Sequence, residues 1–337
     1  MKLQLYDIRL CRTDEWEKLR DFLNKYWKEN HILVTSKTLF EFQYTDGRSG
    51  HYDFVVAVHK ETQEFHAILG FISSSTYDGG SIENPEAYYG AIWKVRDDIE
   101  NKEVHKLGLG VLFYLIKMFP NSPYITLGLS NDSQNVYKPL HFDFGKMKHY
   151  YIANPNVLDF KLAYHPKLSP SQELSDVIIR ELNDIPEINN SFYPNKNNMY
   201  LRNRYINHPV YKYKIWGVYS NDKLQSIWIY RVVEAEGTSC IRIMDMVGKL
   251  SNLGNIVAQL VELMKKYDAE YIDCYNYGIN PDSFFALGFK EVEGDTIIPN
   301  YFEPYLRKNI DIHYASFSKK TVAIFKADGD QDRPSMI

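Results

Sequence analysis

The same order of predicted elements occurs twice along this chain of 337 residues, at an offset of roughly 145 to 160 residues. Each copy contains a hairpin, a strand, a helix, a further strand and a short helical segment. Repeat units of solenoid proteins are only about 20 to 50 residues long. A period of this length therefore predicts two similar domains.

The first copy begins with two apolar, β-branched stretches separated by polar turn residues, which is the pattern of a β-hairpin. We place its elements as strands at 53–60, 65–73 and 88–95, a helix at 105–119, a strand at 124–130 and a short helix at 133–145. The second copy has strands at 214–220, 225–233 and 240–248, a helix within 253–267, a strand at 270–278 and a short segment ending at 284–289. This mixture of hairpins and helices predicts an α+β fold.

The segment between the copies is rich in Pro and Asn, a composition that favours connecting loops. We therefore predict an N-terminal domain at 1–155, a linker at 156–200 and a C-terminal domain at 201–337. Within the linker, DVIIRELND at 176–184 is predicted as a helix. The terminal KADGDQDRPSMI is predicted as a solvated tail, although the unusual DGDQDRP also fits a binding role.

Charge and cysteine content argue against several classes of protein. The net charge of −4 gives no overall basic field to attract nucleic acid or an anionic membrane, so a phosphate-bearing ligand needs a local site. The three cysteines, Cys11, Cys240 and Cys274, have no metal-ligand spacing and predict neither a disulfide framework nor a zinc site. Charges interrupt the N-terminal sequence before a signal peptide could form, and no run of about 18 apolar residues occurs. We expect a cytoplasmic protein without membrane insertion.

The segment HKLGLG at 105–110 follows a predicted strand and a charged loop and opens a predicted helix. A turn there can aim backbone N–H groups at an anion, glycines allow close approach, and the helix dipole favours negative charge. Its spacing is neither that of a Walker loop nor that of a dinucleotide fingerprint. The segment is therefore a candidate phosphate-binding site of another type.

A strand ending at Val95, a loop and HKLGLG entering a helix resemble the acyl-CoA motif of the GNAT superfamily of N-acyltransferases. In that superfamily the motif is Gln or Arg, two residues, Gly, one residue, then Gly or Ala, and its amides bind the CoA pyrophosphate. Gly108 and Gly110 match this motif, whereas His105 replaces the Gln or Arg. The resemblance implies tandem GNAT-like domains, each with a mixed, largely antiparallel sheet flanked by helices.

Asn131 and Tyr137 resemble a second motif of the superfamily, in which Asn contacts CoA and Tyr protonates the leaving thiolate. The resemblance thus implies that Tyr137 is the catalytic acid. It implies CoA contacts at Val95, His105, Lys106, Leu107, Gly108, Leu109, Gly110 and Asn131. In the second copy, Gly248 and Gly254 lack the CoA-loop spacing, so this domain resembles a degenerate copy that binds the acceptor or completes the cleft.

Three further stretches, at 28–44, 204–213 and 297–305, and the terminal DGDQDRP resemble tandem GNAT-like proteins of bacterial capsule and O-antigen gene clusters. Transfer to an amine needs a base, and histidine titrates nearest neutral pH. The candidate bases are His31, His51, Glu41 and His141. We place the base at His31, in the first of these stretches; a structural hydrogen bond is the alternative role of its ring.

Acceptor contacts are assigned mostly from the same stretches. They are Glu41, Gln43, Tyr44, Arg204, His208, Asn300, Tyr301, Glu303, Asp330 and Arg333. Polar side chains such as Asn300 and Asp330 can hydrogen-bond sugar hydroxyls, and Arg333 suits a carboxylate or a diphosphate. Arg204 and His208 are expected at the domain interface, although His208 before a proline can equally shape a turn.

The resemblance implies an acyl-CoA-dependent N-acyltransferase that uses acetyl-CoA or another acyl-CoA and needs no metal. The resemblance implies an amino sugar, nucleotide-linked or free, as acceptor in bacterial surface polysaccharide biosynthesis. One alternative is a tandem-GNAT transferase that takes aminoacyl-tRNA, against which the acidic net charge stands. Another is a GNAT-like binding protein without turnover, and O-acylation also stays open.

Overall fold

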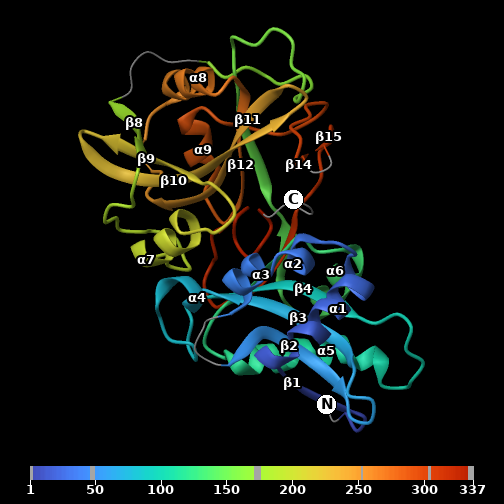
Figure 1. Ribbon diagram of the computed structural model, residues 1–337. Helices are drawn as coiled ribbons and strands as arrows, with labels where there is room; N and C mark the ends of the chain where they lie inside the picture. Colours follow the sequence, from blue (N-terminus) through green and yellow to red (C-terminus); the bar gives the residue numbers. More distant parts are fainter. Residues whose placement is uncertain (1–2, 46–49, 171–175, 252, 303–304, 333–337) are drawn as a thin grey trace.

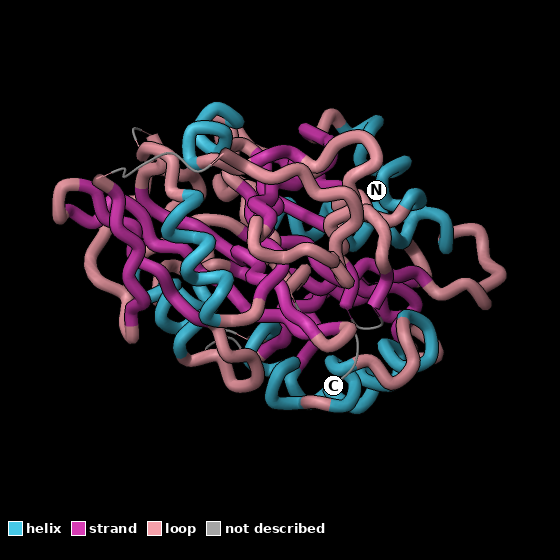
Figure 2. The backbone as a smooth tube through the Cα atoms, turned by 90° about the horizontal axis from the view of Figure 1, so that it is seen from above, coloured by secondary structure: helices cyan, strands magenta, loops and turns pink. Residues whose placement is uncertain are grey.

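The structure is a computed structural model that describes residues 3–45, 50–170, 176–251, 253–302 and 305–332. Two large sheets organise these residues, one around each copy of the predicted elements (Figure 1). Helices surround a central array of strands (Figure 2). The predicted α+β class is therefore confirmed. Among the described residues, no helix is both long enough and apolar enough to span a bilayer.

The first sheet has seven strands, and its first four are antiparallel neighbours, whereas β4 and β5 run parallel. In sheet order the strands are β1 (Tyr6–Arg12), β2 (His51–His59), β3 (Phe65–Ser73), β4 (Tyr88–Val95), β5 (Tyr124–Leu127), β16 (His313–Phe317) and β6 (Asp143–Lys146). The helices of this half are α1 (Trp16–Phe22), α2 (Ile32–Thr35), α3 (Lys37–Tyr44), α4 (Ser75–Asp78), α5 (Val104–Met118) and α6 (Asn131–Tyr137). Shorter helical turns are η1 (Thr13–Glu15), the π-helix η2 (Leu23–Trp27) and η3 (Lys138–Leu140).

Strands β2 and β3 are apolar along nearly their whole length because both faces of the sheet are covered. Val55 and Ala57 share a buried cluster with helix α5, whereas Phe54 and Val56 belong to the cluster of α1 and α3. Successive side chains of a strand point to opposite faces, so one run of apolar residues serves both layers.

The second sheet has eight strands. In order they are β13 (Lys290–Glu291), β7 (Lys148–Ala153), β12 (Ala269–Tyr277), β11 (Thr238–Gly248), β10 (Lys223–Ala235), β9 (Lys214–Ser220) and β8 (Val177–Leu182), and β17 (Ile324–Phe325) pairs with β12. The helices are α7 (Asn198–Leu201), the π-helix η4 (Arg202–Ile206), α8 (Val257–Lys266) and α9 (Pro281–Leu287), and β14 (Tyr301–Phe302) pairs with β15 (Tyr305–Leu306).

The two faces of the second sheet have different partners. Helix α8 packs through Leu260 and Met264 into the cluster of Trp216 and Trp228. On the other face, Ile215, Ile227 and Ile229 join the same buried cluster as Ile32 and Leu39 of the first half. A continuous apolar core therefore connects the two halves of the molecule.

Each half also lends a strand to the sheet of the other. Strand β7 pairs with β12 in the second sheet, with Ile152 opposite Ile272. Strand β16 lies between β5 and β6 in the first sheet. The division of the chain at residues 155 and 200 stays a prediction, but the exchange shows that the sheets are interlocked.

Two local predictions were wrong. The segment 176–184 contains the strand β8 instead of a helix, because Val177 and its β-branched neighbours complete the free edge of β9. The C-terminal segment is also no solvated tail, since Asp328, Asp330 and Asp332 are all buried. Its described part, up to residue 332, lies between the two sheets (Figure 1).

Candidate active site

A cavity of about 300 Å³ opens where β4 and β5 part. The parallel pairing of these strands covers only Tyr88 to Gly90 of β4, which continues to Val95 along β3. The backbone of β4 beyond Gly90 is therefore unpaired on its β5 side, over the residues that the structure describes. Such strand amides can donate hydrogen bonds to a bound chain.

Tyr137 lies at this cavity and is fully buried, at the end of helix α6. Its hydroxyl oxygen lies 2.7 Å from that of Tyr124. Burial raises the pKa of Tyr137 well above its ordinary value, so the phenol keeps its proton at neutral pH. A Cβ at Gly90 would lie 2.0 Å from the Tyr124 hydroxyl oxygen, so only glycine leaves room for this pair of hydroxyls.

The predicted CoA loop lies inside helix α5, which begins at Val104. Of the first amides of this helix, that of Glu103 donates to the Asn101 side chain, that of Val104 to the Asn101 carbonyl and that of Lys106 to the Glu103 carbonyl. A Cβ at Gly108 would lie 3.4 Å from Trp93 and 3.5 Å from Val95, in ordinary contact. The segment opens helix α5, as predicted from the sequence, and packs this helix closely on β4. Its role in binding the CoA diphosphate stays a prediction.

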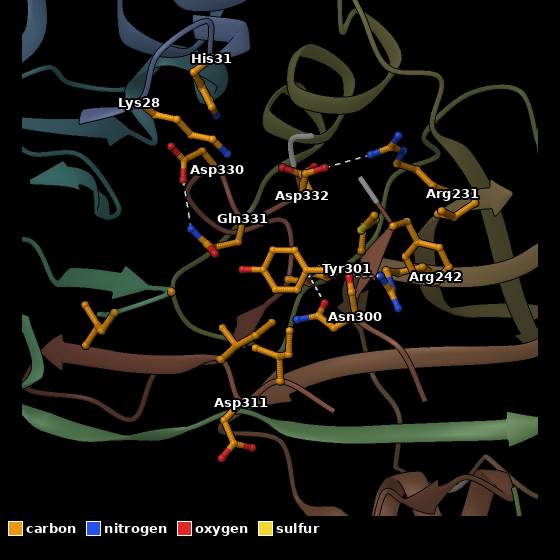
Figure 3. A pocket seen from close by; sticks show the side chains of 18 of the residues that line it. Lys28, His31, Arg231, Arg242, Asn300, Tyr301, Asp311, Asp330, Gln331 and Asp332 are labelled. Carbon is orange, nitrogen blue, oxygen red and sulfur yellow. Dashed lines mark hydrogen bonds between the residues drawn. The ribbon is translucent and has the colours of Figure 1, made fainter. Parts of the chain in front are cut away.

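A second cavity of about 420 Å³ lies between the two halves of the molecule. Lys28, His31 and Asp330 lie on one side of it and Arg231 and Arg242 on the other (Figure 3). Tyr301 and Asn300 lie between these groups (Figure 3). The lining is rich in charged and amide side chains, which suits a polar ligand.

The C-terminal segment is fixed between the halves by partners from several elements. Lys196 lies 2.8 Å from both Asp245 and Asp328. Arg204 lies 2.8 Å from Asp332. The Tyr44 hydroxyl donates to Asp330 over 2.6 Å. Buried charges need such partners, so these contacts hold the residues that line the central cavity.

His31 lines the central cavity and caps helix α2. Its Nδ1 accepts a hydrogen bond from the Leu33 amide over 3.2 Å. The neutral ring therefore carries its proton on Nε2, and this nitrogen is a donor. In this tautomer Nδ1 is occupied by the Leu33 amide, and the role of His31 as the base stays a prediction.

Lys326 also lines the central cavity, and its ammonium or amine nitrogen donates to the Asn300 side-chain oxygen over 2.7 Å. Arg242 lies beside it and is held by Asp273 and by the carbonyls of Pro299 and Asn300. Burial and the charge of Arg242 lower the pKa of Lys326 to about 7. This lysine therefore titrates near neutral pH.

The structure brings only some of the predicted acceptor residues together. His31, Asn300, Tyr301 and Asp330 line the central cavity, and Tyr44 supports Asp330. Of the described residues predicted as acceptor contacts, Glu41, Gln43, Arg204 and His208 line neither cavity. Glu303 and Arg333 lie outside the described residues.

His208 has a structural role. Its Nδ1 accepts from the amides of Val210 and Tyr211, and burial together with Arg204 lowers its pKa to about 3. The ring is therefore neutral and shapes the turn before β9.

Two of the residues predicted to contact CoA lie at the ends of elements. Val95 ends β4, and Asn131 begins α6 with an exposed side chain.

Sequence reasoning missed Tyr124, Arg231, Arg242 and Lys326. The last three share one signal, because each is a cation within an apolar, strand-like stretch: IYRVV, CIRIM and AIFKA. A charge buried in a sheet needs a partner or a function. Tyr124 carried no such signal, since one tyrosine among 27 in the chain is unremarkable.

The two cavities adjoin each other. Trp27, Gly128 and Leu129 line both. A ligand between β4 and β5 and a ligand in the central cavity would therefore meet at these three residues.

No protein-family model and no curated protein matches the chain. Among solved structures, a GCN5-related N-acetyltransferase from Anabaena variabilis is similar over 92% of this chain and 72% of its own, with 9% identity and a TM-score of 0.53. A protein of unknown function from Enterococcus faecalis, called a probable N-acyltransferase, is similar over 92% of this chain and 71% of its own, with 10% identity and a TM-score of 0.51. At these identities the likeness shows the fold, which is the GNAT-like fold expected from the sequence.

Proposed function

We propose that the protein is an acyl-CoA-dependent N-acyltransferase. One observation carries this proposal: a cavity between parting strands, with a buried tyrosine hydroxyl, adjoins a polar cavity at Trp27, Gly128 and Leu129. A transferase has to hold its two substrates next to each other, and adjoining cavities can do this. The fold, shared with proteins named as acetyltransferases, agrees with this reading.

The donor would lie between β4 and β5 with its thioester near Gly128. Amides of β4 beyond Gly90 can hydrogen-bond the acyl-bearing arm and the oxyanion of the tetrahedral intermediate. Tyr137, kept protonated by burial, would donate to the leaving thiolate. Of the four amides in the first turn of α5, those of Val104 and Lys106 are bonded within the protein. No partner within the described residues is found for the amides of His105 and Leu107, so the start of this helix would contribute to binding of the donor's diphosphate.

The acceptor would enter the central cavity with its amine toward Gly128. Asn300, Tyr301 and Gln331 offer amide and hydroxyl groups to sugar hydroxyls, and Lys28 and Arg231 offer positive charge to a phosphate. These groups support an amino sugar, nucleotide-linked or free, as the acceptor. A role in bacterial surface polysaccharide biosynthesis rests on the sequence resemblance.

A thiol-release assay tests the proposal. The purified protein is given acetyl-CoA and a panel of free and nucleotide-linked amino sugars, and mass spectrometry of the product identifies the acylated atom. We expect release of CoA that depends on the acceptor and is strongly reduced by Tyr137→Phe. Binding of acetyl-CoA without product from any amine would favour the binding protein, and transfer from aminoacyl-tRNA alone would favour the other transferase.

A further inference from the structure

We propose that Lys326 is the general base that deprotonates the acceptor amine. This inference rests on the proposed function and names a group of the same site. It concerns the central cavity, where Lys326, His31 and Asp330 line the space that the acceptor would fill.

The surroundings of Lys326 favour a neutral amine. Its side chain is 8% exposed, and its hydrogen-bond partner is the uncharged side-chain oxygen of Asn300. Among the described residues, no carboxylate lies within 4 Å of Lys326 Nζ. A buried ammonium without a counter-charge is costly, so the proton is held weakly.

Charged groups around Lys326 shift its pKa in opposite directions, and burial has the largest effect. Arg242 and Arg231 disfavour its protonation, and Asp273 and Asp332 favour it. Asp273 is bonded to both Arg242 and His149, and Asp332 is paired with Arg204. The ring of Tyr275, 5.5 Å from Nζ, completes the surroundings. Burial therefore decides the balance, and the pKa of Lys326 falls to about 7.

A neutral Lys326 has the lone pair that His31 Nδ1 lacks, because that nitrogen already accepts the Leu33 amide. In the proposed step the acceptor ammonium gives one proton to Lys326 Nζ and becomes a free amine. The amine nitrogen then attacks the thioester carbon, and the C–S bond breaks. The second proton on that nitrogen passes, through Tyr137, to the thiolate. Lys326 finally releases its proton to water, so that one acyl group is transferred and one proton is released.

The first experiment needs no activity. In protein labelled with ¹³C-lysine, the Cε shift of Lys326, assigned by its absence from Lys326→Met, is followed against pH. We expect a midpoint near 7, whereas an ordinary lysine titrates near pH 10.4. A midpoint above 9 would overturn the proposal, because such a lysine is charged when the acceptor binds.

The second experiment uses the pH profile of kcat/KM. The wild type should lose activity as the pH falls through about 7. Lys326→Met should lower kcat on the order of 10²-fold or more with KM for acyl-CoA unchanged, and should remove this limb of the profile. Lys326→Arg, which stays charged, should not restore it. The exposed Lys319→Met is the matched control and should behave as the wild type.

The outcomes separate the two proposals. A wild type that acylates amines while Lys326→Met keeps its rate and pH profile would overturn the base and leave the proposed function standing. A wild type that acylates no amine would overturn the proposed function, and the base role with it. The Cε titration then still reports whether the lysine is neutral.

Discussion

The hydroxyl oxygens of Tyr124 and Tyr137 lie 2.7 Å apart in the buried wall of the cavity between β4 and β5. Their pairing depends on Gly90, whose missing side chain leaves the space that the Tyr124 hydroxyl occupies. Three elements thus meet at the Tyr137 hydroxyl: β4, its neighbour β5, and helix α6, which follows β5 in the chain. This arrangement holds a protonated phenol at the cavity, which is what the proposed role of Tyr137 as the acid requires.

Replacing Tyr137 with Phe should separate chemistry from binding. The variant lacks the hydroxyl proposed to protonate the thiolate, so kcat should fall on the order of 10²-fold while KM for acyl-CoA changes little. Steady-state kinetics with a thiol reagent measure both constants. Tyr124→Phe is the matched control, because it removes the neighbouring hydroxyl and keeps that of Tyr137. An equal loss of kcat in the two variants would show that the Tyr137 hydroxyl has no role beyond that of its hydrogen-bonded pair with Tyr124.

Replacing Gly108 with Ala tests the role of the glycine segment. Gly108 lies inside α5, and its added methyl group would make only ordinary contacts, so the variant should gain about 0.5–1 kcal/mol in unfolding free energy. Gly90→Ala should instead lose about 1–3 kcal/mol, since its methyl group would overlap Tyr124. Urea denaturation measures both changes. Loss of acetyl-CoA binding in Gly108→Ala would show that this glycine contacts the donor after all.

The sequence predicted the elements around the cavity between β4 and β5 better than it predicted the central cavity. Local apolar patterns predicted the strands at 88–95 and 124–130 and the helix between them, although β5 ends at Leu127. Tyr137 was singled out by its place in a motif. The central cavity depends on contacts between distant segments, such as Tyr44 with Asp330, 286 residues apart. No local pattern reports such a pairing. Strand β8 was missed for the same reason, because the free edge of β9 decides its conformation.

The buried pair of Arg204 and Asp332 should be important for stability. Both side chains are almost fully buried, so Arg204→Met leaves an uncompensated carboxylate and should cost about 3–5 kcal/mol. Lys265→Met, which removes the exposed pair with Glu262, should cost less than about 1 kcal/mol. Thermal unfolding of the two variants gives the comparison. Similar melting temperatures would mean that the C-terminal segment is held by its other contacts.

The pH dependence of stability gives a last test of Lys326. The pKa of this lysine is about 7 in the folded protein, whereas an unfolded lysine has a pKa of about 10.4. Between these values the unfolded chain binds the extra proton, so this group makes the folded protein less stable as the pH falls from 10.4 to 7. Below pH 7 both states are protonated, and the destabilisation is constant.

Lys326→Met lacks this proton equilibrium. Its unfolding free energy should exceed that of the wild type most clearly at pH 7, and the advantage should shrink by up to about 1.4 kcal/mol per pH unit toward pH 10. Other groups titrate alike in both proteins, so the difference between the two denaturation series isolates Lys326. Parallel stability curves would mean that Lys326 is charged in the folded protein at neutral pH, and such a lysine cannot accept a proton from the substrate.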